Sequence, residues 1–237
     1  MRRPFGERIT VDTDRDQVWV QNAKGEATYR VGPSEAFAAI SRVWLRSGWD
    51  NKHVYSFTWL GRPIIQLPED MIRIQEVIYR PQPDVIVETG IAHGGCFLFY
   101  ASLCKLMGAG CVIGIDKEIR PHNRAAIEAH PLASLITLIE LDSVDPVTIV
   151  NVRTKVPPNA RTMALLDSCH TKEHVLAEVN ACAELVSPGS YIVAMDGIMQ
   201  DVAGAPRSQP DWTWHNPQCA AREFVKEHPN FCIEEPA

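Results

Sequence analysis

Short apolar runs alternate with helical patterns from residue 84 onward. The runs are rich in Val, Ile, Leu and Met, and they predict buried strands at 84–88, 111–116, 135–140, 162–167 and 191–196. Apolar residues at helical spacing predict helices at 95–107, 121–129, 145–153, 171–186 and 217–227. This alternation predicts an α/β fold with a doubly wound, mostly parallel sheet, and a further short strand is expected near 231–234.

The first part of the chain follows a different pattern. Residues alternate between apolar and polar at 17–21 and 27–31, on either side of the turn residues Asn22 to Gly25, which predicts a hairpin. Apolar residues at helical spacing after Ser34 predict a helix at 35–46. These elements form an N-terminal extension to the sheet.

Residues 51–67 are rich in aromatic side chains and have little periodicity, which predicts a loop. The loop either lies over a site or tethers the N-terminal segment to the core. A helix is expected at 68–79, because Pro68 and two acidic residues suit its first turn. The expected division is an extension at 1–67 and a ligand-binding domain at 68–237.

Composition narrows the class of protein. The chain has 237 residues with 46% hydrophobic and 22% charged residues, which is an ordinary globular balance. A net charge of −6 argues against nucleic acid as a partner. The seven cysteines lack a Cys-x-x-Cys pair, so neither a disulfide framework nor a zinc knuckle is expected. No apolar run approaches the ~18 residues of a membrane span, and the first seven residues do not resemble a signal peptide, so we expect a cytoplasmic protein.

Acidic residues stand at or just after the end of every predicted strand. They are Glu88, Asp116, Asp142, Asp167 and Asp196. Ligands of doubly wound sheets bind beyond the carboxyl ends of the strands. A row of acids along that edge therefore indicates a ligand site rather than a solvated rim.

The turn after the first of these strands contains Gly90, Gly94 and Gly95. Their spacing matches neither G-x-G-x-x-G nor a P-loop, which argues against a pyrophosphate ligand. Glu88 would repel phosphate and suits a ligand with a cationic amine. His93 either contacts the amino-acid portion of such a ligand or is an ordinary exposed loop residue.

The next strand ends predict the rest of the ligand. Asp116 is placed to accept hydrogen bonds from two ribose hydroxyls. Asp142 and Ser143 are placed to meet an adenine edge, and Ser143 is also a candidate N-cap for the helix near 145. A ribose, an adenine and an amino-acid cation together indicate S-adenosylmethionine.

Asp167 and Asp196 end neighbouring strands of the predicted sheet. Adjacent strands lie ~4.8 Å apart, so these two carboxylates can share a hard divalent cation such as Mg²⁺. Asp167 is alternatively a cap for the helix that follows.

Four stretches together carry a resemblance to a known family. They are Val87-Glu88-Thr89-Gly90-Ile91-Ala92-His93-Gly94-Gly95, Ile113-Gly114-Ile115-Asp116, Leu166-Asp167-Ser168-Cys169-His170-Thr171-Lys172-Glu173-His174-Val175 and Gly189-Ser190-Tyr191-Ile192-Val193. The chain resembles class I S-adenosylmethionine-dependent methyltransferases, in the family that groups cephalosporin-hydroxylase-type proteins with rhamnosyl and macrolide-sugar O-methyltransferases. The resemblance implies an O-methyltransferase whose substrate is a small hydroxylated acceptor, such as a sugar of a glycan or a natural product.

The resemblance also implies roles at the metal site. Asp167 and an acidic pair after the fifth strand would hold the metal, and His170 would be the general base. This chain has Met195 before Asp196, where the family typically has a second acid. Candidates for a third metal ligand are Ser168, His170, Asp201 and His174; otherwise metal binding is weak or lost. His170 is alternatively a helix-entry residue that bonds a loop.

Two further expectations concern the last part of the chain. The long loop at 197–216 carries Trp212 and Trp214, which either stack on a sugar ring or pack the loop onto the core. Class I methyltransferase sheets close with an antiparallel strand pair, and this chain ends before the second strand. A truncated chain and a strand from another subunit both explain this, and we expect a homo-oligomer.

Two rival functions remain at this point. One is an oxidative tailoring protein of the cephalosporin-hydroxylase type, although no 2-His-1-carboxylate spacing is evident. The other is a non-catalytic protein that binds S-adenosylmethionine, which Met195 and the incomplete strand pair would favour.

Overall fold

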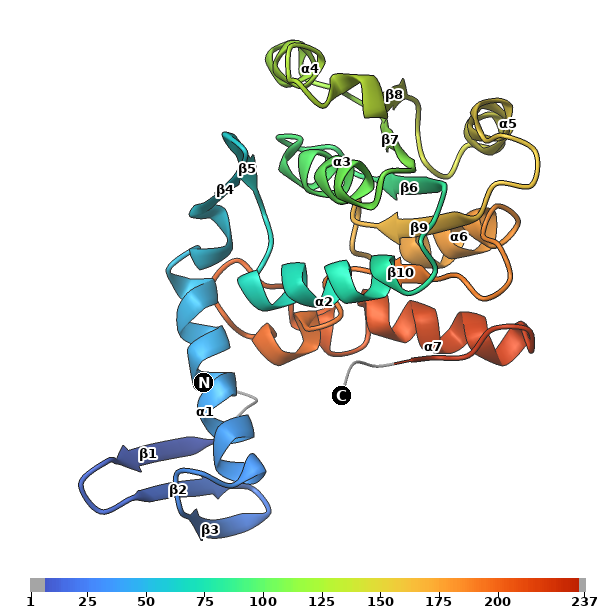
Figure 1. Cartoon of the computed structure of the whole chain (residues 1–237). Helices are drawn as coiled ribbons and strands as arrows, with labels where there is room; N and C mark the ends of the chain where they lie inside the picture. Colours follow the sequence, from blue (N-terminus) through green and yellow to red (C-terminus); the bar gives the residue numbers. More distant parts are fainter. Residues whose placement is uncertain (1–6, 235–237) are drawn as a thin grey trace. The chain divides into compact units, whose positions relative to one another are not determined.

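The computed structural model describes residues 7–234 (Figure 1). The expectation about a signal peptide rests largely on residues 1–6, which lie outside this range. The chain forms two compact units: one runs through His53 and includes Ile198–Thr213, and the other comprises Val54–Gly197 and the chain from Trp214 onward. None of the described helices has both the length and the apolar character needed to cross a bilayer.

The first unit contains a small antiparallel sheet and one helix. Its strands are β1 (Arg8–Asp12), β2 (Gln17–Asn22) and β3 (Gly25–Tyr29), in the order β1-β2-β3, followed by α1 (Ser34–Asp50). The predicted hairpin is β2–β3, and β1 adds a strand that the sequence analysis missed. Val18 and Val20 of β2 pack with Ala36 and Ala39 of α1 in one apolar cluster.

The long loop contributes two short 3-10 helices to this unit, η3 (Met199–Val202) and η4 (Pro210–Thr213). The indole Nε1 of Trp49 donates a hydrogen bond to the carbonyl of Pro206 at 2.6 Å. The ring of Trp212 meets that of Trp49 edge-on, with centroids 5.5 Å apart. Trp212 therefore packs on α1 of this unit, and its stacking on a sugar ring stays a prediction.

The second unit is built on a five-stranded parallel sheet. In spatial order its strands are β10 (Ile192–Ala194), β9 (Thr162–Leu166), β6 (Val85–Thr89), β7 (Cys111–Asp116) and β8 (Ile136–Glu140). The predicted α/β fold and all five predicted strands are confirmed. The strand expected near 231–234 is wrong, because this segment turns back on α7 instead: Phe231 packs edge-on against Phe224, with ring centroids 5.1 Å apart.

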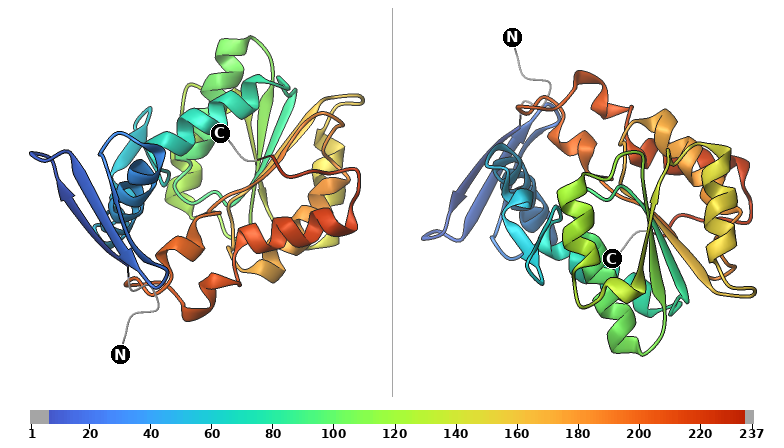
Figure 2. Two further views of the ribbon diagram at one scale, coloured as in Figure 1. Left: turned by 90° about the horizontal axis from the view of Figure 1, so that it is seen from below. Right: turned by 90° about the horizontal axis from the view of Figure 1, so that it is seen from above.

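Helices cover both faces of this sheet (Figure 2). They are α2 (Pro68–Tyr79), α3 (Gly95–Met107), α4 (Pro121–Glu128), α5 (Pro146–Lys155), α6 (Lys172–Ala183) and α7 (Pro217–Glu227). Strand alternation separates two cores. Ile86 of β6 packs with the apolar side chains of α2 and α3, whereas Val85 and Val87 pack with Val152 of α5. Burial on both faces explains why the strands read as continuous apolar runs.

The aromatic segment forms a hairpin where a loop was expected. After the short helix η1 (His53–Tyr55), β4 (Phe57–Trp59) pairs with β5 (Arg62–Ile64). The turn between them works because Leu60 and Gly61 both have positive φ, as a tight hairpin turn requires. Trp59 packs edge-on against Phe99 of α3, with ring centroids 4.9 Å apart, and its Nε1 donates to Ser102 Oγ at 3.2 Å. This hairpin belongs to the unit that holds the sheet, and the division of the chain at residue 67 stays a prediction.

Candidate active site

Strand register brings three acids to one edge of the sheet. Glu88 pairs with Leu165 across β6 and β9, and Ala194 pairs with Leu166 across β10 and β9. Asp167 and Asp196 therefore follow the ends of adjacent strands. Asp196 has a φ of 55°, a conformation that is uncommon for a residue with a side chain.

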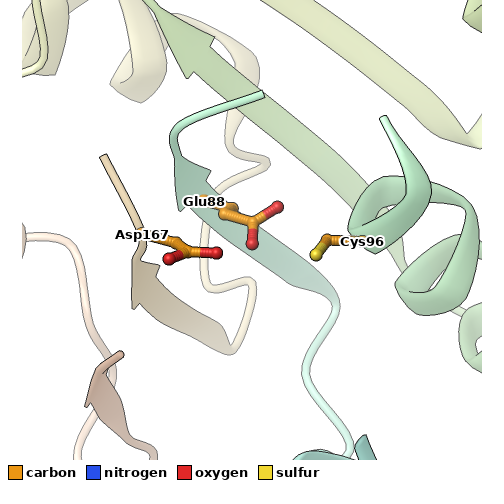
Figure 3. A group of neighbouring side chains, drawn as sticks. All are labelled: Glu88, Cys96 and Asp167. Atoms are coloured by element: carbon orange, nitrogen blue, oxygen red, sulfur yellow. The ribbon is translucent and has the colours of Figure 1, made fainter. Parts of the chain in front are cut away.

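The first group at this edge joins Glu88, Cys96 and Asp167 (Figure 3). Their potential ligand atoms all lie within 4.8 Å of one another. Glu88 is fully buried, and its Oε1 accepts a hydrogen bond from the Tyr100 hydroxyl at 3.0 Å. Glu88 Oε2 is buried and has no hydrogen-bond partner among the described residues. A buried carboxylate oxygen without a partner is costly, and it marks a position that a donor from a ligand can satisfy.

Burial raises the pKa of Glu88 well above its usual range, and the charge of Asp167 adds to this, against the opposing effect of the Tyr100 hydrogen bond. Burial and then the charge of Asp196 also raise the pKa of Asp167, although Gln66 Nε2 donates to Asp167 Oδ2 at 3.1 Å and opposes the shift. The site therefore holds more negative potential than its donors neutralise, and it suits a cation.

The second group joins Asp167 to His170 and Asp196, again with ligand atoms within 4.8 Å of one another. His170 Nε2 lies 3.1 Å from Asp196 Oδ2. Among the histidine and aspartate candidates for a third metal ligand, His170 is the one that joins this group. Met195 is buried in the apolar core and contributes no oxygen.

The glycines of the loop have a structural explanation in addition to the predicted one. A Cβ on Gly90 would lie 2.1 Å from the carbonyl oxygen of Asp167, and a Cβ on Gly95 would lie 2.2 Å from that of Pro63. Gly94 has a φ of 84° and would meet Ile127 at 2.5 Å. Close backbone packing therefore requires glycine at 90 and 95, and the positive φ favours it at 94, whether or not a ligand is bound.

Asp116 and His93 both help to hold this loop. Asp116 Oδ2 accepts a hydrogen bond from the Ile91 amide at 2.8 Å, and its Oδ1 accepts one from the Glu118 amide at 3.2 Å. The carbonyl of His93 accepts two hydrogen bonds from the Arg62 guanidinium, at 3.0 and 2.7 Å. The predicted contacts of Asp116 with ribose and of the His93 ring with the ligand stay predictions.

At the end of β8, Asp142 Oδ1 accepts a hydrogen bond from the Val144 amide at 3.2 Å. The alternative role of Ser143 as a helix cap is wrong, because Asp145 caps α5 by accepting from the Val147 amide at 2.9 Å. Ser143 Oγ instead lies 3.3 Å from His174 Nε2.

Four residues around the site were not identified from the sequence: Gln66, Cys96, Tyr100 and Glu178. Cys96 and Tyr100 are four residues apart on α3, and helical spacing was the signal that could have grouped them with the site. Gln66 is 101 residues away from its partner Asp167, and no local pattern indicates that contact.

Comparison with known proteins extends the picture. A family model described as rhamnosyl O-methyltransferase/CmcI matches residues 51–237. A rhamnosyl O-methyltransferase of Mycobacterium tuberculosis (strain H37Rv) is 27% identical over 203 residues, which cover 84% of this chain and 77% of that protein. The structure of a putative caffeoyl-CoA O-methyltransferase from Staphylococcus aureus is similar with a TM-score of 0.54 and 16% identity, covering 80% of this chain and 83% of the other. A CmcI structure with Mg and SAM is similar with a TM-score of 0.49 and 20% identity, covering 74% and 67%.

Proposed function

The chain belongs to the rhamnosyl O-methyltransferase/CmcI family, and from this premise we propose that it transfers a methyl group from S-adenosylmethionine to a hydroxyl of a sugar or another natural product. The observation that carries this proposal is Asp167, which belongs to two groups of side chains at once. One group surrounds a buried acid that needs a donor, and the other is a pair of acids with a histidine.

The first group fits the amino-acid end of the cofactor. Glu88 Oε2 has no hydrogen-bond partner among the described residues, and an ammonium group supplies both the missing donor and a compensating charge. The loop with Gly90, His93 and Gly94 connects the strand of this acid to α3, which begins at Gly95. Asp116 would then accept from the ribose, and Asp142 with Ser143 would meet the adenine.

The second group fits a divalent cation. Two carboxylates, Asp167 and Asp196, offer the oxygen ligands that Mg²⁺ prefers. The absence of a second acid at Met195 leaves the pair with one carboxylate fewer than the family pattern. We therefore expect weaker metal binding than a site with three acids would give.

His170 is the proposed base, and its contact with Asp196 determines which nitrogen acts. Because Asp196 Oδ2 lies 3.1 Å from Nε2, the carboxylate accepts the Nε2 proton and leaves Nδ1 as the acceptor. The proton of the acceptor hydroxyl therefore moves to His170 Nδ1.

When bound, the cofactor supplies an electrophilic methyl group and the cation favours the deprotonated form of the acceptor hydroxyl. With Glu88 holding the amino-acid end of the cofactor and His170 taking the hydroxyl proton, the acceptor oxygen would bond to the methyl carbon as the carbon–sulfur bond breaks and leaves its electron pair on sulfur. The products are a methyl ether and S-adenosylhomocysteine. Asp167 and Asp196 would hold the cation.

Calorimetric titration with S-adenosylmethionine, with and without Mg²⁺, tests the proposal. We expect binding of the cofactor, and tighter binding of the acceptor when Mg²⁺ is present. A chain that binds no cofactor under either condition would contradict the proposed function. If neither Mg²⁺ nor EDTA affects cofactor binding and turnover, only the role of the metal is contradicted, and the methyltransferase proposal stands.

We further propose that the protein acts in the cytoplasm as a homo-oligomer. Among the described residues β10 is an edge strand of the parallel sheet, and an edge strand presents unpaired backbone groups that a strand of another subunit can pair with. Light scattering after size-exclusion chromatography measures the oligomeric state directly, and a monomer at micromolar concentration would contradict this part.

A further inference from the structure

A buried polar network lies beside the proposed cofactor site and is not explained by the roles above. It joins Ser143 after β8 and Ser168 after β9 to two residues one turn apart on α6, His174 and Glu178. Glu178 and Ser143 are 1% and 8% exposed. A charged residue as buried as Glu178 is unusual, and it is retained in proteins only with compensating partners or a function.

The hydrogens of this network can be assigned from the distances. Ser168 Oγ donates to Glu178 Oε1 at 2.6 Å, because a carboxylate only accepts. The single hydrogen of Ser168 is then used, so its 3.1 Å contact with His174 requires the hydrogen to be on Nε2. His174 Nε2 also lies 3.3 Å from Glu178 Oε1. The carboxylate of Glu178 therefore fixes His174 as an Nε2–H donor.

This assignment determines what Ser143 can do. Its Oγ lies 3.3 Å from the same Nε2, and a nitrogen that carries a hydrogen has no lone pair to accept with, so the Ser143 hydroxyl does not donate to His174. Its own hydroxyl hydrogen is not used within the network. Ser143 is thus left as a donor at the strand end where an adenine is proposed, and adenine ring nitrogens are acceptors.

We infer that His174 and Glu178 are positioning residues for cofactor recognition: they hold the Ser143 hydroxyl as a donor to a purine ring nitrogen of the cofactor. This inference rests on the proposed function, because it assumes that an adenosine group binds at the end of β8. A second observation supports it. Glu178 Oε2 is buried without a hydrogen-bond partner among the described residues, a cost that packing alone does not require.

The test is a double-mutant cycle on Ser143 and His174, with S-adenosylhomocysteine as the probe in calorimetric titration. Ser143→Ala removes the donor, and we expect about tenfold weaker binding, the usual effect of deleting one hydrogen bond. His174→Gln should have a similar effect, because it leaves Ser143 without its fixed partner. If His174 acts through Ser143, the double variant is no worse than Ser143→Ala alone.

Additional variants separate positioning from folding. Ser143→Thr keeps the hydroxyl and should restore binding. Glu173→Gln, on the exposed side of the same helix, is the matched control and should bind as the wild type does. In turnover assays, the Ser143 and His174 variants should raise KM for S-adenosylmethionine and leave kcat at saturating cofactor unchanged.

Cofactor analogues identify the acceptor atom. Among analogues of S-adenosylhomocysteine in which one purine nitrogen is replaced by CH, one should bind wild type about tenfold more weakly but bind Ser143→Ala no worse than the parent compound does. The inference would be overturned if the affinity losses of the two single variants multiplied in the double variant. It would also be overturned if every analogue weakened binding equally in wild type and in Ser143→Ala. Either result would leave the proposed function intact. A wild-type chain that binds no S-adenosylhomocysteine would overturn both.

Discussion

Replacing Glu88 by Gln should have two opposite effects, weaker cofactor binding and a more stable free protein. The change keeps the shape of the side chain and keeps an oxygen that accepts from the Tyr100 hydroxyl, 3.0 Å from Oε1 in the wild type. It removes one negative charge from a fully buried position. It also replaces the partnerless Oε2 with a donor group.

Cofactor affinity should fall because the amide cannot neutralise an ammonium group. A hydrogen bond to a charged partner contributes about 1.5–3 kcal/mol, so the dissociation constant should rise about ten- to hundredfold. The loss lies near the upper end of this range if the new amide hydrogens face the ammonium. Tyr100 should keep its position in either case.

The free Glu88→Gln protein, in contrast, should be more stable than the wild type, and this difference should depend on pH. Burial raises the pKa of Glu88 in the folded protein above its value in the unfolded chain. The folded state therefore retains a proton that the unfolded state releases, and wild-type stability falls as pH rises through that interval. The amide of the Glu88→Gln variant does not titrate, so the Tm advantage of this variant should be absent near pH 4 and should grow toward alkaline pH.

Two measurements test these effects. Calorimetric titration with S-adenosylhomocysteine gives the cofactor affinity, and thermal unfolding from about pH 4, near the usual carboxyl pKa, up to about pH 9 gives the stability. Glu128→Gln, an exposed residue paired with Arg124 on α4, is the matched control and should change neither quantity. Unchanged cofactor affinity in Glu88→Gln would refute the role of Glu88. A Tm advantage that shrinks as pH rises would refute the argument from burial.

Three further changes test other parts of the site. His170→Ala should lower kcat by about 10²–10⁴-fold while cofactor affinity stays constant, and steady-state kinetics with calorimetry would detect a base elsewhere if kcat were unchanged. Asp196→Asn should raise the Mg²⁺ concentration needed for half-maximal turnover, and an identical Mg²⁺ dependence would exclude this acid as a ligand. Gly90→Ala should destabilise the fold by about 1–3 kcal/mol or more, because its Cβ would lie 2.1 Å from the Asp167 carbonyl. Gly189→Ala is the control for backbone strain alone, since Gly189 has a φ of 75° and open space around it. If both variants lose the same free energy of unfolding in urea, the clash at Gly90 is not the cause.

The sheet and its helices were predictable because burial on both faces leaves a strong signal. The runs at 84–88 and 162–167 are almost entirely apolar before their terminal acids, and the strands lie within a residue of these bounds. The β4–β5 hairpin was missed because each strand has three residues and its turn uses Leu60, a residue that rarely adopts positive φ. Short pairs of this kind carry too few alternating positions to stand out.

The part of the site that lies at the strand ends was predictable from the sequence. Acids that end parallel strands must meet at one edge, so the proximity of Asp167 and Asp196 follows from topology alone. The partners Gln66 and Glu178 come from a segment before the sheet and from a helix, and their contacts depend on packing angles that periodicity does not specify. Glu178 in particular reads as a solvent-facing residue until the fold buries it.

The burial of Met195 determines whether position 195 could carry a second acid beside Asp196. Its side chain is 6% exposed and packs in the apolar core, while Asp196, in a left-handed conformation, lies beside His170. Replacing Met195 by Glu would bury a carboxylate among apolar side chains, which is destabilising without a partner. A second acid at this position therefore requires polar partners that the surrounding core does not supply, so a metal site with two adjacent acids needs changes in the core as well as at residue 195.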